Sequence, residues 1–521
     1  MSSHIQVGRH VPKSPRTSIC ILAYGRATML NRCLRSLRQV TQGSDQVETI
    51  VVANQVPAGE LAQVEDPSQL VMVTSETNLG FGAGNDCAAE LAHGEYLVFL
   101  NDDSTIEPDF LEHLVATVGS DPSIGAVGSR IALPDGTLQE AGSVIWNNGS
   151  TTHIGLGLRM DTERFNYLRD ADYVSANGFL IRRSAWDAVG GFDDRYHPAY
   201  FEDVDLCMSL RDHGYRVLYE PRSLVHHLES QSTSRRYREF LLARNRAQFF
   251  EKWRHQLEQF GKPESSNPRA IEAGIQRARG NPGQLLVIAR EFFLDDLQSG
   301  SSRLLTQMDT FGANGWAITL LLNEKCLEGL SYRRDRSGPR DRLVELGVEL
   351  SCEAPSAFLG RAAKNFDAIV LDDGQNSDDV FQAIRLHQPR AQVLSSAGDD
   401  PLGDLSAIKA TATNGGSSAG YATGPKGRAT MQEAPKDPPH AAGSPEPREA
   451  VEHLQRKLDL ANAELRVRAE YIERLEADLS GLEMRLASEP SVKIRGYLSK
   501  ILGPSLSRRL VKLSKRHRTG R

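Results

Sequence analysis

Two adjacent carboxylates, Asp102 and Asp103, follow Asn101 at the end of an apolar run at residues 96–100. A β-branched and aromatic run of this length is typical of a buried strand in an α/β sheet, and such sheets bind ligands at the carboxyl ends of their strands. Adjacent carboxylates are costly there unless they hold a cation, and a hard metal that also binds a diphosphate is the usual reason for the arrangement. The alternative is a turn that caps the next helix, because Asp102, Asp103 and Ser104 are all good cap residues.

A second pair of carboxylates, Glu202 and Asp203, begins a helix-like stretch that runs to residue 213. Backbone N–H groups at the start of a helix favour carboxylates, so helix placement alone could explain this pair. The chemical alternative is a general base, which many group transfers require.

Two histidines, His226 and His227, follow a strand-like run and a proline turn. A single histidine is more often structural than a ligand.

The composition is that of a soluble globular protein, with 40% hydrophobic and 25% charged residues. A length of 521 residues predicts roughly two or three domains plus linkers. The net charge of −6 gives no general attraction to nucleic acid. The six cysteines show no C-x-x-C pair, which favours reduced thiols in a cytoplasmic protein over disulfides or zinc. The polar N-terminus predicts no signal peptide, and no run approaches the roughly 20 apolar residues of a membrane-spanning helix.

Residues 17–260 alternate strand-like and helix-like runs, which predicts a mostly parallel sheet covered on both faces. The strand-like runs lie at 18–23, 48–53, 70–74, 95–100 and 124–127, and the helical stretches lie at 28–40, 84–92 and 108–118. A second, smaller α/β unit is predicted at residues 282–398. Its strand-like runs lie at 285–288, 317–322, 368–371 and 392–394. The expected fold class is therefore α/β, with two sheet-containing units.

The rest of the chain is predicted to contain a linker and a coiled coil. Residues 399–449 are rich in Gly, Ala, Ser, Pro and Thr and have almost no large aliphatic side chains, as a disordered linker does. Residues 450–488 carry apolar side chains at 3-4 spacing, which predicts a coiled coil that self-associates or binds a partner helix. Arg468 at a seam position would weaken this coil. The alternative is a single amphipathic helix that folds back on the globular part.

Residues 491–521 combine apolar side chains with ten basic residues, and no acidic residue follows Glu489. A cationic helix with an apolar stripe suits an anionic membrane surface. The alternative is a solvated basic tail, or one that binds an acidic partner. We therefore expect a cytoplasmic protein that is peripheral at the inner face of the plasma membrane.

Several segments of residues 17–255 resemble, in order and at similar spacing, the inverting family 2 glycosyltransferases of GT-A fold. The opening strand and first helix of that family resemble residues 18–37, and its loop over the nucleotide resembles residues 78–85. Asn101-Asp102-Asp103 occupies the place of the family's DxD motif. The remaining matches are the acceptor-side segments 177–183 and 190–193, the segment 201–206 that carries the catalytic base, and His227 as the late metal-site histidine.

The resemblance implies a role for each matching residue. Asp203 would be the base that deprotonates the acceptor hydroxyl, and Glu202 would position the acceptor. Asp103 and His227 would bind Mg²⁺ or Mn²⁺, with His227 preferred over His226. The nucleotide-sugar donor is expected to contact Ala23, Tyr24, Arg26, Asn54, Asn78, Gly80, Asn85 and Asp102.

The sequence departs from the family pattern where the nucleotide base is read. The family usually has an aspartate after its second strand, and Ala53 stands there. Base recognition must then rest on Asn54, on backbone groups or on the loop at 78–85, which leaves both dTDP- and UDP-sugars open. No Gln-x-x-Arg-Trp stretch follows the base, which disfavours a processive synthase. The resemblance leans toward the bacterial rhamnosyltransferase-like branch, which builds cell-surface polysaccharide.

The unit at 282–398 resembles, more loosely, the N-terminal lobe of a GT-B glycosyltransferase, most clearly at residues 295–303. The donor-binding lobe that should follow is replaced by the linker, so this unit is expected to be non-catalytic and to engage an acceptor or partner.

Two functional hypotheses fit the whole chain. One is a metal-dependent transferase that moves a sugar, with rhamnose as a candidate, to a cell-surface glycan or lipid-linked precursor. The other is a non-catalytic scaffold of a polysaccharide assembly complex. Ala53 and Asn101 slightly favour the scaffold. The retention of Asp103, Asp203 and His227 favours the enzyme more strongly, because a scaffold has no use for three costly polar residues in one cleft.

Overall fold

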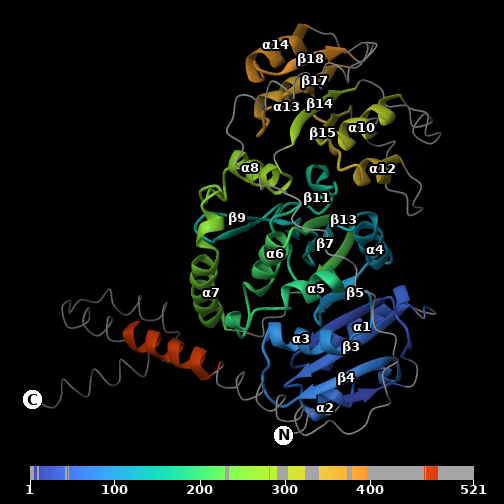
Figure 1. Ribbon diagram of the computed structural model, residues 1–521, viewed down its shortest axis with the longest axis vertical. Coiled ribbons are helices and arrows are strands. Elements are labelled where there is room, and N and C mark those ends of the chain that lie inside the picture. The colour runs from blue at the N-terminus through green and yellow to red at the C-terminus, as the bar shows by residue number, and fades with distance from the viewer. Residues whose placement is uncertain are drawn as a thin grey trace, which may run out of the picture. The chain divides into compact units, whose positions relative to one another are not determined.

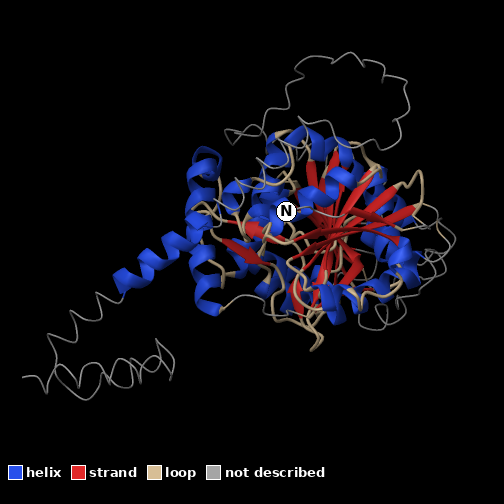
Figure 2. Cartoon of the chain, turned by 90° about the horizontal axis from the view of Figure 1, so that it is seen from below, coloured by secondary structure: helices blue, strands red, loops and turns tan. Residues whose placement is uncertain are grey.

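The computed structural model describes residues 5–8, 11–41, 44, 46–228, 234–280, 282–289, 303–322, 339–371, 378–395, 463 and 465–478. The chain divides into two compact units, Met1–Glu446 and Pro447–Arg521. The first unit contains an eleven-stranded sheet, a five-stranded sheet and a two-stranded hairpin, with helices packed around the two larger sheets (Figure 1 and Figure 2). The predicted α/β class is therefore confirmed.

The first half of the larger sheet consists of four parallel strands joined by helices, with one antiparallel strand at its edge. β2 (Thr17–Ala23) lies between β3 (Val47–Asn54) and β5 (Tyr96–Asn101), and β4 (Leu70–Ser75) pairs with the far side of β3. The strands are apolar and almost fully buried, as a sheet covered by helices requires. The other elements of this half are β1 (Ile5–Val7), α1 (Ala27–Thr41), α2 (Ala58–Leu61) and α3 (Phe81–Leu91).

The second half of the larger sheet mixes strand directions. β12 (Phe179–Arg182) is antiparallel to both β5 and β7 (Ile124–Ala132), and β13 (Arg216–His227) runs parallel to β7. β6 (Ser104–Ile106) pairs with the end of β13 and places His227 opposite Ser104. The remaining elements are α4 (Phe110–Ser120), β8 (Leu138–Glu140), β9 (Ser143–Ile145), β10 (Thr151–His153), β11 (Arg169–Asp170), α5 (Arg183–Val189), α6 (Glu202–Asp212), α7 (Arg235–Leu257) and α8 (Pro268–Ala278).

The smaller sheet is parallel throughout, with strand order β16-β15-β14-β17-β18. Its strands are β14 (Gly283–Ile288), β15 (Trp316–Leu321), β16 (Glu349–Ser351), β17 (Ala368–Leu371) and β18 (Gln392–Ser395). Its helices are α10 (Arg303–Ala313), α12 (Pro339–Glu345), α13 (Pro355–Arg361) and α14 (Asp378–His387). The predicted second α/β region is thus present. Its likeness to a GT-B lobe stays a prediction, because residues 295–302 lie outside the described residues.

The C-terminal predictions fall mostly outside the described residues, which include none of the linker at 399–449 or the tail at 491–521. Residues 465–478 form a helix, as the heptad pattern predicts. Two seam residues, Leu465 and Ile472, are 65% and 54% exposed in this single chain. Coiled-coil association stays a prediction. Among the described residues, no helix is long and apolar enough to cross a membrane.

Candidate active site

The turn Asn101-Asp102-Asp103 follows β5 and connects it to two other strands. Asp102 Oδ2 accepts a hydrogen bond from the backbone N–H of Tyr24 at 2.8 Å, which joins the carboxyl ends of β5 and β2. Asp103 Oδ1 lies 3.1 Å from Nε2 of His227 at the end of β13. Nδ2 of Asn101 lies 3.5 Å from the same ring nitrogen. Five residues from three strand ends therefore meet at one edge of the sheet.

His227, and not its neighbour, points toward this turn. Nδ1 of His227 lies 2.8 Å from Oε1 of Gln139, which leaves Nε2 facing Asp103. Nε2 of His226 instead lies 3.0 Å from Oε1 of Glu107. Consecutive residues of a strand point to opposite faces, so the two histidines cannot serve the same site. The geometry supports the preference for His227.

The donor set of this turn fits a divalent cation shared with a ligand. Burial, with a smaller contribution from Asp103, raises the pKa of Asp102 to about 7 against an opposing hydrogen bond from Tyr24. A nearby cation would stabilise the charged form of such a carboxylate. Among the described residues, no three His, Cys, Asp or Glu side chains form a complete metal site. Asp103 and His227 could supply two ligands, and phosphate oxygens and water the rest, as Mg²⁺ sites commonly do.

The predicted nucleotide loop is held in place by Asn54. Asn54 is 2% exposed; its Oδ1 accepts from the N–H of Leu79 at 2.8 Å, and its Nδ2 donates to Oδ1 of Asn78 at 2.9 Å. Oδ1 of Asn78 also accepts from the N–H of Gly80 at 3.0 Å. Both ends of the Asn54 amide thus bind the loop. We therefore assign Asn54 to positioning the loop, and base recognition must come from other groups.

The other predicted donor contacts differ in their surroundings. Tyr24 and Arg26 are exposed beside the carboxyl end of β2, whereas Ala23 is buried. Asn85 is buried within α3, and its Nδ2 donates to the carbonyl oxygen of Phe81 at 3.0 Å. Asn85 therefore stabilises the first turn of the helix rather than facing outward.

Gly80 has a φ of +73°, and a Cβ there would lie 2.7 Å from the carbonyl oxygen of Pro198, so glycine is required.

Glu202 and Asp203 occupy the first turn of α6, directly after two strained residues. Tyr200 and Phe201 have φ angles of 77° and 78°, which residues with side chains rarely adopt. Strain of this kind concentrates at functional sites. Burial, with a further contribution from Glu140, raises the pKa of Asp203 to about 6, whereas burial and then Asp203 raise the pKa of Glu202 well above its usual range. Both adjacent carboxyls therefore have raised pKa values, as an acid–base pair at a catalytic site does.

Three consecutive residues, 175–177, connect the base to the turn after β5. The N–H of Ser175 donates to Oε1 of Glu140 at 3.1 Å, and the N–H of Ala176 donates to Asp203. Oδ1 of Asn177 accepts from the N–H of Asn101 at 3.2 Å and from the hydroxyl of Ser104 at 3.1 Å. One short segment therefore links the two groups of carboxylates that were predicted from separate parts of the sequence.

Sequence reasoning missed Glu140, His153 and Gln139 of this site. Glu140 and Gln139 lie on the three-residue strand β8, and His153 lies on the three-residue strand β10. No motif or periodicity marks such short segments. Gln139 could have been found only from its position opposite His227, which the sequence does not show.

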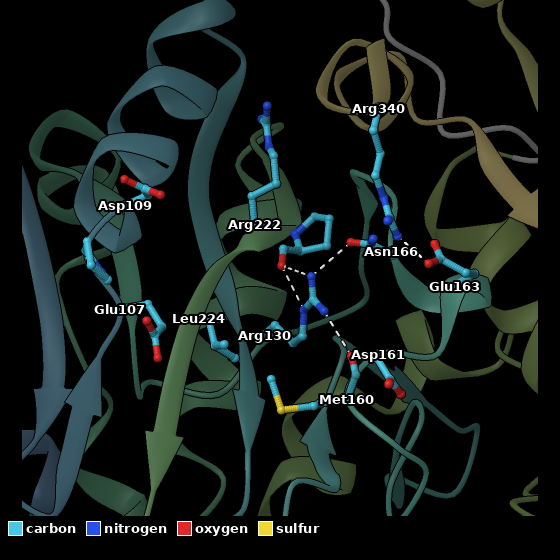
Figure 3. Close-up of a pocket in the computed structure, with 12 residues that line it drawn as sticks. Glu107, Asp109, Arg130, Met160, Asp161, Glu163, Asn166, Arg222, Leu224 and Arg340 are labelled. Atoms are coloured by element: carbon cyan, nitrogen blue, oxygen red, sulfur yellow. Dashed lines mark hydrogen bonds and ion pairs between the residues drawn. The ribbon is translucent and has the colours of Figure 1, made fainter. Parts of the chain in front are cut away.

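A separate cavity of about 380 Å³ lies beside β13, where α12 approaches the larger sheet (Figure 3). None of the predicted site residues lines it. Its arginines are already paired: Arg130 donates to backbone oxygens of Pro221 and Met160, Arg222 contacts Glu345 at 2.9 Å, and Arg340 contacts Glu163. We assign this cavity to the packing between the two sheet-containing regions.

Residues 18–189 match the family model described as Glycosyl transferase family 2. This match covers about a third of the chain, and it agrees with the family and the GT-A fold that the resemblance predicts. The matched segment contains the turn after β5 and the loop at 78–80, both of which the structure describes. The match ends before α6 and β13, which carry Asp203 and His227.

Three curated relatives are similar to less than half of the chain. An uncharacterized protein, y4gI, of Sinorhizobium fredii is 32% identical over 42% of this chain and 25% of its own length. The O-antigen biosynthesis protein RfbC of Myxococcus xanthus is 31% identical over 43% of this chain and 18% of its own length. The N-acetylglucosaminyl-diphospho-decaprenol L-rhamnosyltransferase of Mycobacterium tuberculosis is 27% identical over 42% of this chain and 77% of its own length. The chain thus spans a quarter or less of the first two relatives.

Proposed function

We propose that this chain transfers a sugar from a nucleotide-diphosphate donor to a hydroxyl group, with inversion at the anomeric carbon. The observation that carries the proposal is the segment 175–177, which contacts both Asp203 and the Asn101-Asp102-Asp103 turn. An inverting transfer needs a base for the acceptor and charge neutralisation for the leaving group, and these two features supply one each.

The proposed chemistry assigns a part to each residue. Asp203 accepts the proton of the acceptor hydroxyl while the oxygen attacks the anomeric carbon and the bond from that carbon to the diphosphate breaks. Glu202 keeps its proton and donates a hydrogen bond that orients the acceptor. Asp103 and His227 would hold Mg²⁺ or Mn²⁺, and such a cation neutralises the departing diphosphate. Asn54 holds the loop at 78–80 over the nucleotide.

The relatives suggest the class of substrate. The Myxococcus relative is named for O-antigen biosynthesis, and the mycobacterial one for rhamnosyl transfer to a diphospho-decaprenol-linked sugar. We extend these names to a proposal: the donor is a dTDP- or UDP-sugar, rhamnose is the candidate sugar, and the acceptor is a cell-surface glycan or lipid-linked precursor. The chain would then act in polysaccharide or cell wall biogenesis.

A thermal-shift screen of sugar nucleotides tests this function. A ligand that binds only the native state stabilises it by about 2.7 kcal/mol at a hundredfold excess over Kd. We expect a dTDP- or UDP-sugar to raise the Tm in the presence of Mn²⁺ and to raise it less with EDTA. The donor that passes this screen is then incubated with a glycan acceptor, and NMR of the product should show inverted anomeric configuration. Retained configuration would contradict the assigned mechanism.

A non-catalytic scaffold is the second candidate, and Ala53 and Asn101 favour it. Both stand where the resembled family usually has a carboxylate. A scaffold predicts no metal-dependent stabilisation by any sugar nucleotide. The same screen therefore separates the two functions.

We also propose that the C-terminal region brings the catalytic domain to a membrane. Ten basic residues at 491–521 could each contribute on the order of 1 kcal/mol at an anionic surface, weakened by salt. The full-length protein should float with anionic liposomes, and a chain ending at residue 398 should not. Sedimentation should show self-association of the full-length protein through residues 450–488. Equal flotation of both proteins would contradict the membrane proposal, and a monomeric profile would contradict the association.

A further inference from the structure

Glu140 is a buried carboxylate to which the proposed reaction assigns no part. It is 1% exposed and accepts hydrogen bonds from both the N–H and the hydroxyl of Ser175. Its Oε2 lies 3.2 Å from Nδ1 of His153, which comes from the neighbouring hairpin of β9 and β10. A buried carboxylate is costly unless it is paired and hydrogen-bonded. Glu140 and His153 therefore form an acid–imidazole pair.

The contacts of this pair favour its ionic form. Burial alone would lower the pKa of His153, but the hydrogen bond and charge of Glu140 outweigh burial and raise that pKa. Burial alone would raise the pKa of Glu140, but His153 and Ser175 outweigh burial and lower that pKa. Ser143 Oγ lies 2.9 Å from Nδ1 of His153, and the ring of Tyr173 lies 6.2 Å from the imidazole, so one side of the ring is fixed.

The pair lies next to the proposed base. Neighbouring backbone N–H groups, those of Ser175 and Ala176, donate to Glu140 and to Asp203 respectively. After burial, Glu140 is the strongest influence that raises the pKa of Asp203, and His153 acts in the opposite direction. The other charged groups around the cluster are Glu202, beside Asp203 on α6, and Arg238 of α7, which acts on His153.

We propose that Glu140 and His153 are positioning residues that set the charge of Asp203 for proton transfer from the acceptor. The Glu140 carboxylate holds the imidazolium ring beside Asp203 through Nδ1. The same carboxylate accepts from the N–H of Ser175, which fixes the adjacent N–H of Ala176 that donates to Asp203. This inference rests on the proposed function, because it assigns Asp203 as the base. It adds two residues, Glu140 and His153, to the acceptor side of the proposed site.

The two members of the pair act on Asp203 with opposite sign, which gives the test its direction. His153→Asn removes a cation, so the pKa of Asp203 should rise and the acid limb of kcat/KM should move to higher pH. Glu140→Gln removes an anion whose influence exceeds that of His153, so the acid limb should move to lower pH even if His153 also becomes neutral. Each shift should reach up to about one pH unit.

The pH profiles of the two variants are compared with that of a matched control. Nδ1 of His93 lies 3.4 Å from Oε2 of the buried Glu48, so His93→Asn removes an imidazole from a similar acid–imidazole pair at a different place. His93→Asn should leave the acid limb unchanged. Shifts of the two test variants in one direction, or no shift in either, would overturn the proposal. If Glu140→Gln does not unfold cooperatively, the pH profile of His153→Asn alone tests the proposal, because this variant keeps the buried carboxylate and its serine contacts.

NMR of histidine-labelled protein provides a readout that does not depend on transfer. The ring of His153 should titrate above pH 6.5 in the native chain, and Glu140→Gln should lower that midpoint. A His153 midpoint unchanged by Glu140→Gln would overturn the pairing. If the native protein shows this titration but no transfer to any acceptor, the proposed function fails while the pair stands. If transfer occurs and the pH profiles do not move as stated, the positioning role alone fails.

Discussion

Two buried glutamates in this chain have nearly the same partners but lie at opposite ends of the sheet. Glu48 accepts from the hydroxyl of Ser18 at 2.6 Å and from the N–H of His93 at 2.7 Å, and the His93 ring lies 3.4 Å away. Glu140 likewise has a serine, a backbone N–H and a histidine ring. Both glutamates are 1% exposed. The residue types and the burial of the two glutamates therefore cannot tell the clusters apart, although the side chain of His93 is 71% exposed and that of His153 is 35% exposed.

The Glu48 and Glu140 clusters differ in their position in the sheet. Ser18 and Glu48 are the second residues of β2 and β3, and the hydroxyl of Ser18 accepts from the N–H of Gly94, two residues before β5. The first cluster thus ties together the amino ends of three parallel strands. The second lies beside Asp203 and the carboxyl edge, where α/β sheets bind their ligands. We conclude that a buried acid–histidine pair is structural at one edge and acts on chemistry at the other.

The largest expected effect is at the carboxyl edge, where Asp203→Asn removes the proposed base. An amide keeps the shape of the site but cannot accept the acceptor proton, so kcat should fall by about 10²–10⁴-fold. Donor binding, measured by calorimetry with Mn²⁺, should stay near that of the native chain. Glu48→Gln is the matched control, since it neutralises a buried carboxylate at the amino edge. Full activity in Asp203→Asn would remove this residue from the role of base.

The next effect concerns the metal ligands. Asp103→Ala and His227→Ala should each weaken Mn²⁺-dependent donor binding, because both side chains face the same point. Gln139→Leu removes the partner of the second ring nitrogen of His227, and the loss of such a partner typically weakens metal affinity by about 10–100-fold. His226→Ala, which loses only a contact to Glu107, should bind donor normally. Native-like affinity in both ligand variants would contradict the metal site.

Much of the larger sheet could be predicted from local sequence. The apolar runs at 18–23, 48–53 and 95–100 became buried strands within a few residues of their expected ends. The antiparallel insertion of β12 could not be predicted, because its register pairs Phe179 with Phe99 across a long stretch of sequence. Local periodicity shows that a strand exists but not which strand it joins.

The site was predictable where a motif carries it and unpredictable where tertiary contacts define it. Asp103, Asp203 and His227 stand in recognisable segments, and the structure places them around one edge of the sheet. Asn54 shows the limit: its sequence position suits either base recognition or loop support, and only its contacts with Asn78 and Leu79 favour support. Glu140 and His153 are brought together by pairings between very short strands, so the sequence offers no signal for them.

The smallest expected effect on transfer is at the amino edge, with Glu48→Ala. This change leaves the hydroxyl of Ser18 and the N–H of His93 without their buried acceptor, and each such group typically costs about 1–3 kcal/mol. Stability should therefore fall, seen as a Tm lower by several degrees, because about 2–4 °C corresponds to 1 kcal/mol in a domain of this size. kcat and the pH profile at 25 °C should match the native chain, since Ser18 and His93, the hydrogen-bond partners of Glu48 in the described part of the chain, lie at the amino edge. A folded Glu48→Ala protein with an altered pH profile would show that the two clusters are coupled, and the distinction between the two edges of the sheet would then be wrong.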